Sequence, residues 1–405
     1  MSEPAPLPDS SFDLCVIGGG VSGLCLARIA AARSGRRTLV LERRPEAGGC
    51  LCSAPMAPGV ALELGAHTCY NSYDRFLEAA AGTDFLARAT SRKGLGFRMV
   101  ERGAVRAIPA CLDFLEAALA LPRAFWTAKD GLTAEAYYGR ILGRRNWERV
   151  LHPALNAVAS QDTAGFPADA LFKRRPRRRK DVLRSFAVRG GLGPAVQALA
   201  EHPAIHLAVG REAVALERTD DGYRMRTSLG ETVRARHVAL AVPAPAARAL
   251  AAPLVPEAAE LLGRITVRPV ASLGLVVGDP LPRLPRLAGL IFTEGPCFSA
   301  VSGDAFPVPG KRAWSFHFDG DRAGDLEAMR AFACRTLGID PDRVEAVFRR
   351  DHVMPSIALG HDRWLGDLDR ALAGTDLMVV GNYLSGMSIE DCAGRAEREH
   401  GRVLG

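Results

Sequence analysis

Three glycines and one glutamate have the types and spacing needed to hold a dinucleotide. Gly18, Gly20 and Gly23 follow the apolar run 12–17, and Glu42 closes the next apolar run. In a strand–turn–helix unit the first glycine permits a tight turn, and the second lets the backbone approach a pyrophosphate. The third lets the helix pack closely on the strand. A carboxylate at the end of the following strand accepts hydrogen bonds from ribose hydroxyls.

These residues require particular elements to position them. We predict a strand over 12–17, a helix that begins beside Gly20, and a second strand that ends at Glu42. The first turn of the helix, with Val21 and Ser22, directs unpaired N–H groups and a positive dipole end at the phosphates.

A second set of glycines follows the acid. Gly48 and Gly49 form a pair shortly after Glu42, and Gly65-Ala66-His67 follows a further acid. With the ribose acid, this pattern resembles the FAD-binding head of the flavin amine oxidase and protoporphyrinogen oxidase superfamily.

The far end of the chain carries a second resemblance. Residues 376–392 contain Gly381-Asn382 and Ser388-Ile389, and they are similar to the C-terminal FAD motif of protoporphyrinogen oxidases. The glycine-rich segment 190–199 and an apolar stretch near Val214 resemble the middle section of the family. In that section a strand passes the adenine.

The resemblance implies non-covalent FAD and a set of residues that contact it. Those cofactor residues are Gly18, Gly20, Val21, Ser22, Gly23, Glu42, Arg43, Arg44, Gly48, Gly49, Cys50, Gly65, Ala66, His67, Val214, Gly381, Asn382, Ser388 and Ile389. Cys50 departs from the family, which usually has a phosphate-binding arginine there. The resemblance implies that this contact comes from elsewhere, with Arg43 and Arg44 as candidates.

Composition and charge set broader limits. The chain has 405 residues, 48% of them hydrophobic, and a formal charge of +7. It is long enough for two structural domains. No apolar run reaches the roughly 20 residues that span a bilayer. Residues 1–10 lack a signal-peptide core, so we expect a disordered leader and a cytoplasmic protein.

The nine cysteines are odd in number and scattered, which predicts reduced thiols. Cys50-Leu51-Cys52 lacks the spacing of a zinc site, and we expect no metal.

Residues 173–180 contain seven basic side chains among eight. Three interpretations remain open. The run is a solvated loop, or it attracts an acidic substrate, a carrier protein or a membrane surface, or it binds nucleic acid. No recognition motif accompanies the run, so we expect no nucleic-acid partner. The sequence does not predict an oligomeric state.

Apolar periodicity predicts further elements. Helices are expected over 73–81, 112–119, 133–142, 147–158, 246–250, 256–262 and 326–337, and strands over 271–277 and 313–318. The resemblance implies an α/β, two-domain FAD-dependent oxidoreductase. Its Rossmann-like FAD-binding domain comprises 11–70, 186–245 and 373–405. An inserted α+β substrate-binding domain comprises 71–185 and 246–372.

The resemblance also implies the activity. We expect an FAD-dependent oxidase or dehydrogenase that takes hydride from a C–C or C–N bond of a small molecule onto flavin N5, with O2 or another acceptor. The candidate catalytic residues are His67 and Tyr383. Two alternatives are a non-redox flavoenzyme resembling the UDP-galactopyranose mutases and a flavin-free binding protein on the same scaffold.

Overall fold

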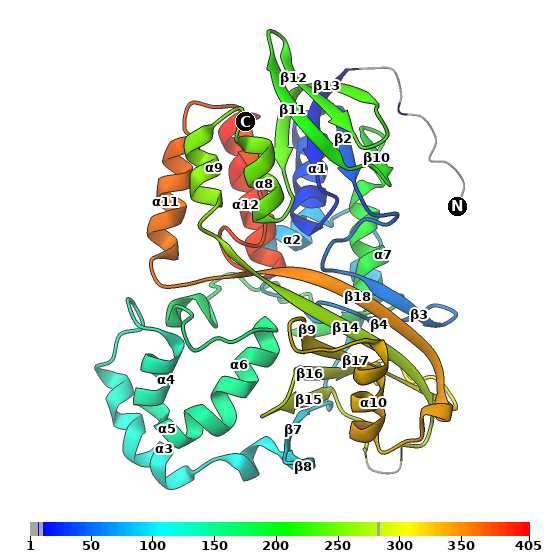
Figure 1. Ribbon diagram of the computed structural model, residues 1–405, viewed down its shortest axis with the longest axis vertical. Helices are drawn as coiled ribbons and strands as arrows, with labels where there is room; N and C mark the ends of the chain where they lie inside the picture. Colours follow the sequence, from blue (N-terminus) through cyan, green and yellow to red (C-terminus); the bar gives the residue numbers. More distant parts are fainter. Residues whose placement is uncertain (1–6, 8–10, 282–283) are drawn as a thin grey trace.

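The protein is described by a computed structural model that covers residues 7, 11–281 and 284–405. The expected leader, 1–10, therefore lies outside the described residues except for Leu7. Two large sheets occupy opposite halves of the molecule, one in the upper part of Figure 1 and one at the lower right.

Within the described residues, the first sheet contains seven strands in the order β10-β2-β1-β13-β12-β11, with β19 paired to β13. They are β1 (Phe12–Ile17), β2 (Thr38–Glu42), β10 (Ile205–Val209), β11 (Ala213–Thr219), β12 (Gly222–Thr227), β13 (Thr232–Leu240) and β19 (Leu377–Val379). Strands β10, β2, β1, β13 and β19 run parallel, and β11 and β12 form an antiparallel extension. Strands β1, β2 and β19 are mainly apolar and buried, because helices cover both faces of the sheet there.

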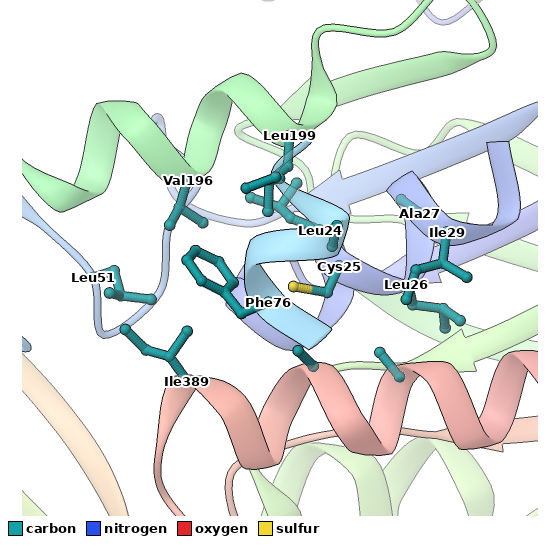
Figure 2. Close-up of a cluster of buried hydrophobic side chains, with 14 of the residues drawn as sticks. Leu24, Cys25, Leu26, Ala27, Ile29, Leu51, Phe76, Val196, Leu199 and Ile389 are labelled. Carbon is teal, nitrogen blue, oxygen red and sulfur yellow. The ribbon is translucent and has the colours of Figure 1, made fainter. Parts of the chain in front are cut away.

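Helices cover this sheet on two sides. On one side lie α1 (Val21–Ser34), α2 (Asp74–Ala79), α7 (Leu192–Gln197) and α12 (Ile389–Val403). Figure 2 shows their shared core, in which Phe76 of α2 lies among Leu24, Val196 and Ile389. On the other side lie α8 (Ala244–Ala251), α9 (Pro256–Leu262) and α11 (His361–Leu372).

The second sheet has the order β18-β14-β17-β16-β15-β7-β8. Its strands are β7 (Phe97–Glu101), β8 (Ala104–Ala107), β14 (Thr266–Gly278), β15 (Gly289–Phe292), β16 (Cys297–Ser302), β17 (Lys311–Asp319) and β18 (Val344–Ser356). Helix α10 (Leu326–Leu337) packs on one face. Strands β14 and β18 are long enough to reach from this sheet to the helices of the first (Figure 1).

Smaller elements complete the fold. The hairpin β3 (Ser53–Ala57) and β4 (Val60–Glu63) packs on the second sheet, and β5 (Cys69–Tyr70), β9 (Ser185–Val188) and β6 (Ala89–Ser91) form a third sheet. A helical group contains α3 (Phe114–Ala120), α4 (Ala134–Leu142), α5 (Arg144–Asn146), the π-helical turn η4 (Trp147–Leu151) and α6 (His152–Ala159). The 3₁₀ turns are η1 (Leu86–Arg88), η2 (Ile108–Cys111), η3 (Leu121–Phe125), η5 (Ala168–Ala170), η6 (Ala198–Ala200) and η7 (Pro341–Arg343).

The α/β class is confirmed, and one packing detail differs from the expected domain plan. Helices α9 and α11 and most of α8 fall within 246–372, which the sequence assigns to the substrate-binding domain, yet they pack on the first sheet. The domain boundaries therefore stay a prediction. None of the described helices has the length and apolar character needed to cross a membrane.

Candidate active site

The glycine turn after β1 has a backbone that only glycine accommodates at two of its positions. Gly18 has φ +112°, and a Cβ there would lie 2.4 Å from the Ala241 carbonyl oxygen. A Cβ on Gly23 would lie 2.1 Å from the Gly18 carbonyl oxygen. The fold itself therefore requires glycine at both positions.

Gly20 is different, because nothing in the protein requires a glycine there. Its backbone is ordinary, with φ −76° and ψ 176°. A Cβ would meet only the Gly49 Cα, at 3.9 Å. Gly20 is the N-cap of α1, so the N–H groups of the first turn have neither an intrahelical partner nor a side-chain cap. We call Gly20 and these N–H groups the phosphate cradle. It fits a phosphate group, which a side chain at Gly20 would obstruct.

Glu42 fixes the two loops that border this space. Its Oε2 accepts the Gly19 N–H at 2.8 Å, and its Oε1 accepts the Arg44 N–H at 2.9 Å. The carboxylate is buried, and each oxygen keeps a further lone pair for a ribose hydroxyl. Gly48 donates to the Gly19 carbonyl at 2.7 Å, which joins the second glycine pair to the first turn.

The loop after the glycine pair is equally close-packed. A Cβ on Gly65 would lie 2.0 Å from the Cys50 carbonyl oxygen, so the two segments touch through their backbones. Glu63 accepts Ser53 Oγ–H at 2.6 Å and the Leu192 N–H at 2.8 Å. The glycine-rich segment that begins at 190 is thereby fastened to the β3–β4 hairpin. Burial raises the pKa of Glu63 to about 7.

Glu63 should make stability fall as pH rises. Its folded pKa lies above the ordinary value of 4.5, so the native state holds this proton more tightly than the unfolded state. Relative to a Glu63→Gln variant, the wild type should lose free energy of unfolding between pH 4.5 and about 7. Urea unfolding at pH 5 and pH 8 measures this difference. Glu46 is exposed, so the difference in free energy of unfolding between the wild type and Glu46→Gln should not change with pH in this way. If the two variants differ from the wild type by the same pH-dependent amount, the assignment to Glu63 is wrong.

His67 is held as a neutral ring. The Arg92 guanidinium donates to its Nδ1 at 2.9 Å, and Thr68 Oγ1 lies 2.8 Å from the same atom. Enclosure by neighbouring residues lowers its pKa to about 3, and the charge of Arg92 contributes in the same direction. Because arginine only donates, Nδ1 is an acceptor and the ring proton lies on Nε2. Arg92 was not found from the sequence, since nothing around it forms a motif.

Tyr383 lies in a different environment. It is 1% exposed and packs with Leu368 and Leu372 in the core between the first sheet and helices α8, α9 and α11. Its hydroxyl has no hydrogen-bond partner among the described residues. The structure records no contact between Tyr383 and His67 within the same set of residues, so its catalytic role stays a prediction.

The tail motif places a second helix N-terminus beside the first. Ser388 caps α12, accepting the Asp391 N–H at 3.0 Å, and Asp391 reaches back to the Ser388 N–H at 3.4 Å. In the first turn of α12, Cys392 hydrogen-bonds to Ser22 in the first turn of α1. The two helices thus begin next to each other, Ile389 among the side chains between them (Figure 2).

The basic run 173–180 partly covers this motif. Lys173 donates to the Ser385 carbonyl, and Arg175 donates to Ser388 Oγ at 2.7 Å and to Asp391 Oδ1 at 3.1 Å. Further along the run, Arg177 pairs with an aspartate of α2 at 3.5 Å. These cations therefore have partners within the chain, which the sequence did not predict. A role in docking a carrier protein or a membrane stays a prediction.

Arg43 and Arg44 follow Glu42, and Val214 comes three residues after Arg211, whose N–H bonds the Glu42 carbonyl at 2.8 Å. Arg43 is exposed and lies 4.0 Å from the carboxylate of Glu212, whereas Arg44 donates to the Asp351 carbonyl at 3.0 Å. Val214, on β11, is 49% exposed. The structure brings the glycine turns, Glu42 and His67 into one connected set of loops, and their contacts with a cofactor stay predictions.

Comparison with known families decides the broad assignment. Residues 21–333 match the family model described as flavin containing amine oxidoreductase. The chain belongs to this family. It is an FAD-dependent oxidoreductase with non-covalent FAD, which agrees with the open cradle at Gly20.

Solved structures with the same fold cover nearly the whole chain. A protein from Exiguobacterium sp. 255-15 assigned as a protoporphyrinogen oxidase has a TM-score of 0.77 at 17% identity, covering 98% of this chain and 99% of that one. Reduced UDP-galactopyranose mutase has a TM-score of 0.73 at 16% identity, covering 96% of this chain and 93% of that one. Cyclohexylamine oxidase from Brevibacterium oxydans IH-35A has a TM-score of 0.69 at 14% identity, covering 98% of this chain and 99% of that one. These likenesses confirm the two-domain flavoprotein fold of this family member.

Proposed function

We propose that this flavoprotein oxidises a C–C or C–N bond of a small organic molecule and passes the electrons to O2 or another acceptor. A porphyrinogen-like compound and a specialised biosynthetic intermediate are the two substrate classes we consider. The observation that carries the proposal is the cradle at Gly20, which is open although the fold would accept a side chain there. The family match supports redox chemistry rather than the two alternatives, a mutase or a flavin-free binding protein.

The residues of the chain would divide the work of binding and positioning. When bound, FAD supplies the hydride acceptor. Glu42 would accept ribose hydroxyls, and the first turns of α1 and α12 would face the phosphates and the flavin. His67 would offer its Nε2–H to an oxygen of flavin or substrate, because its Nδ1 already accepts from Arg92.

The visible spectrum of the purified protein tests this proposal. We expect a flavin band that a panel of amines, dihydro-heterocycles and porphyrinogens bleaches under argon, at least for one compound, and that air restores. No bleaching by any compound, together with tight binding of UDP-sugars to the reduced protein, would favour the mutase alternative. No flavin band even after added FAD would favour the binding-protein alternative.

Substitution of His67 should lower turnover without changing its pH dependence. A His67→Leu variant loses the Nε2–H donor, and we expect kcat/KM to fall about 100-fold, the lower end of what one positioned group supplies. Because the pKa of His67 is about 3, the ring does not titrate between pH 5 and 9. Wild type and variant should therefore have parallel profiles of kcat/KM against pH. An acidic limb near pH 6.5 in the wild type alone would contradict this expectation.

A further inference from the structure

One face of strand β18 lies against the loop that follows the second glycine pair. His352 of this strand hydrogen-bonds the Leu64 carbonyl at 2.9 Å, and the sulfur of Met354 lies 3.8 Å from the Cys50 thiol. Side chains two residues apart in a strand point to the same face. Arg350 therefore extends from β18 toward this loop, next to His352.

Arg350 is half-buried on this face of β18. Its Nε is buried without a hydrogen bond, and it forms no ion pair with any residue that the structure describes. A buried N–H group is normally hydrogen-bonded, so the Nε–H of Arg350 is available to a ligand. The positive charge of Arg350 partly offsets the effect of burial, which raises the pKa of Cys50 and of Cys52.

A second arginine shares this position. Arg44 reaches the Asp351 carbonyl at 3.0 Å, and its own pKa is lowered by burial and then by the nearby charge of Arg350. The carboxylate of Asp351 is already paired with Arg349 at 3.1 Å. The carboxylate of Glu42 also faces Arg44, but its oxygens bind backbone N–H groups of the two loops. Two cations consequently lie side by side where β18 meets the loop between Glu42 and the second glycine pair.

We propose that Arg350, together with Arg44, binds the pyrophosphate of FAD. Two guanidinium groups match the two negative charges of a pyrophosphate and its fork of oxygens. Arg350 would supply the contact for which the family uses an arginine directly after the glycine pair, where this chain has Cys50. The cofactor would then be held by the first sheet and by a strand of the second.

Binding of FAD and of ADP to the apo-protein tests this assignment. ADP carries the adenosine and pyrophosphate of FAD without the flavin, so both ligands should respond alike. We expect Arg350→Met to raise the Kd of FAD and of ADP by about 10- to 100-fold, in line with the loss of charge-assisted hydrogen bonds. The dissociation constants of Arg350→Lys should lie between those of the wild type and of Arg350→Met. The Kd of the wild type should also rise more steeply with salt than that of Arg350→Met.

Arg335→Met is the control, since Arg335 is exposed on α10 and its replacement leaves the Arg349–Asp351 pair intact. It should leave both dissociation constants within about twofold of the wild type. Far-UV circular dichroism and the melting temperature of the apo-proteins show whether each variant is folded. An unchanged FAD affinity in a folded Arg350→Met protein would overturn the proposal. A loss of FAD affinity without a loss of ADP affinity would also overturn it, because Arg350 would then contact the flavin half.

Discussion

A Gly20→Ala variant should fold normally and lose most of its affinity for FAD. The added methyl group occupies free space in the protein, where the nearest atom is 3.9 Å away, but it enters the volume of a phosphate. Overpacking of this kind costs about 1–3 kcal/mol, or roughly 5- to 150-fold in Kd. Quenching of flavin fluorescence on titrating apo-protein into FAD measures the loss.

The stability of the Gly20→Ala apo-protein should change by less than about 1 kcal/mol. Alanine reduces the entropy of the unfolded chain but is a poorer N-cap than glycine, and the two effects oppose each other. Gly23→Ala is the contrasting variant, because its Cβ would lie 2.1 Å from the Gly18 carbonyl oxygen and should destabilise the apo-protein itself. Unchanged FAD affinity in Gly20→Ala would show that no phosphate occupies the cradle.

Replacement of Arg395 should produce the largest loss of stability. Its side chain is fully buried in α12 and donates to the Val379 carbonyl at 3.1 Å and to Asp369 at 2.6 Å. It also pairs with buried Glu399 at 3.0 Å, which accepts the Val379 N–H at 3.2 Å. Arg395→Met leaves a buried carboxylate and carbonyl short of partners, which costs about 3–5 kcal/mol.

Urea unfolding of the apo-protein measures this cost. Arg398→Met, three residues further along α12, is the control, because Arg398 is exposed and, among the described residues, donates only to Ser385 Oγ, at 2.8 Å. Its free energy of unfolding should stay within about 0.5 kcal/mol of the wild type. If the free energy of unfolding of Arg395→Met also stays within 1 kcal/mol of the wild type, these contacts do not hold α12 to β19.

The head of the fold was predictable because its signals are local. The glycine spacing and Glu42 gave both ends of β1, the start of α1 and the end of β2 to within a residue or two. Helix α10 spans Leu326–Leu337 as the sequence predicts. It is bounded by Asp325, whose side chain accepts the Ala328 N–H, and by Gly338 in the left-handed conformation. Capping residues of this kind act within one turn and can be read without tertiary information.

The features that the sequence missed depend on contacts between distant segments. Arg350 lies about 300 residues from Cys50 and follows no motif. Apolar periodicity identified α9 as a helix, but not which sheet buries its apolar face. Likewise, the charge of Lys173 and Arg175 was evident, whereas their partners on the tail motif became visible only in the folded chain.

The order of segments in the first sheet has a consequence for biosynthesis. Strand β1 and helix α1 come near the start of the chain, while β19 and α12, which complete the same sheet and lie beside α1, come more than 340 residues later. At a translation rate of about 5–20 residues per second, α12 is synthesised tens of seconds after β1 and α1. Throughout that interval the apolar side of α1 lacks its cover, so FAD can be captured only after synthesis is nearly complete. Cells that produce this protein faster than it can close should accumulate aggregated apo-protein, whatever the supply of FAD.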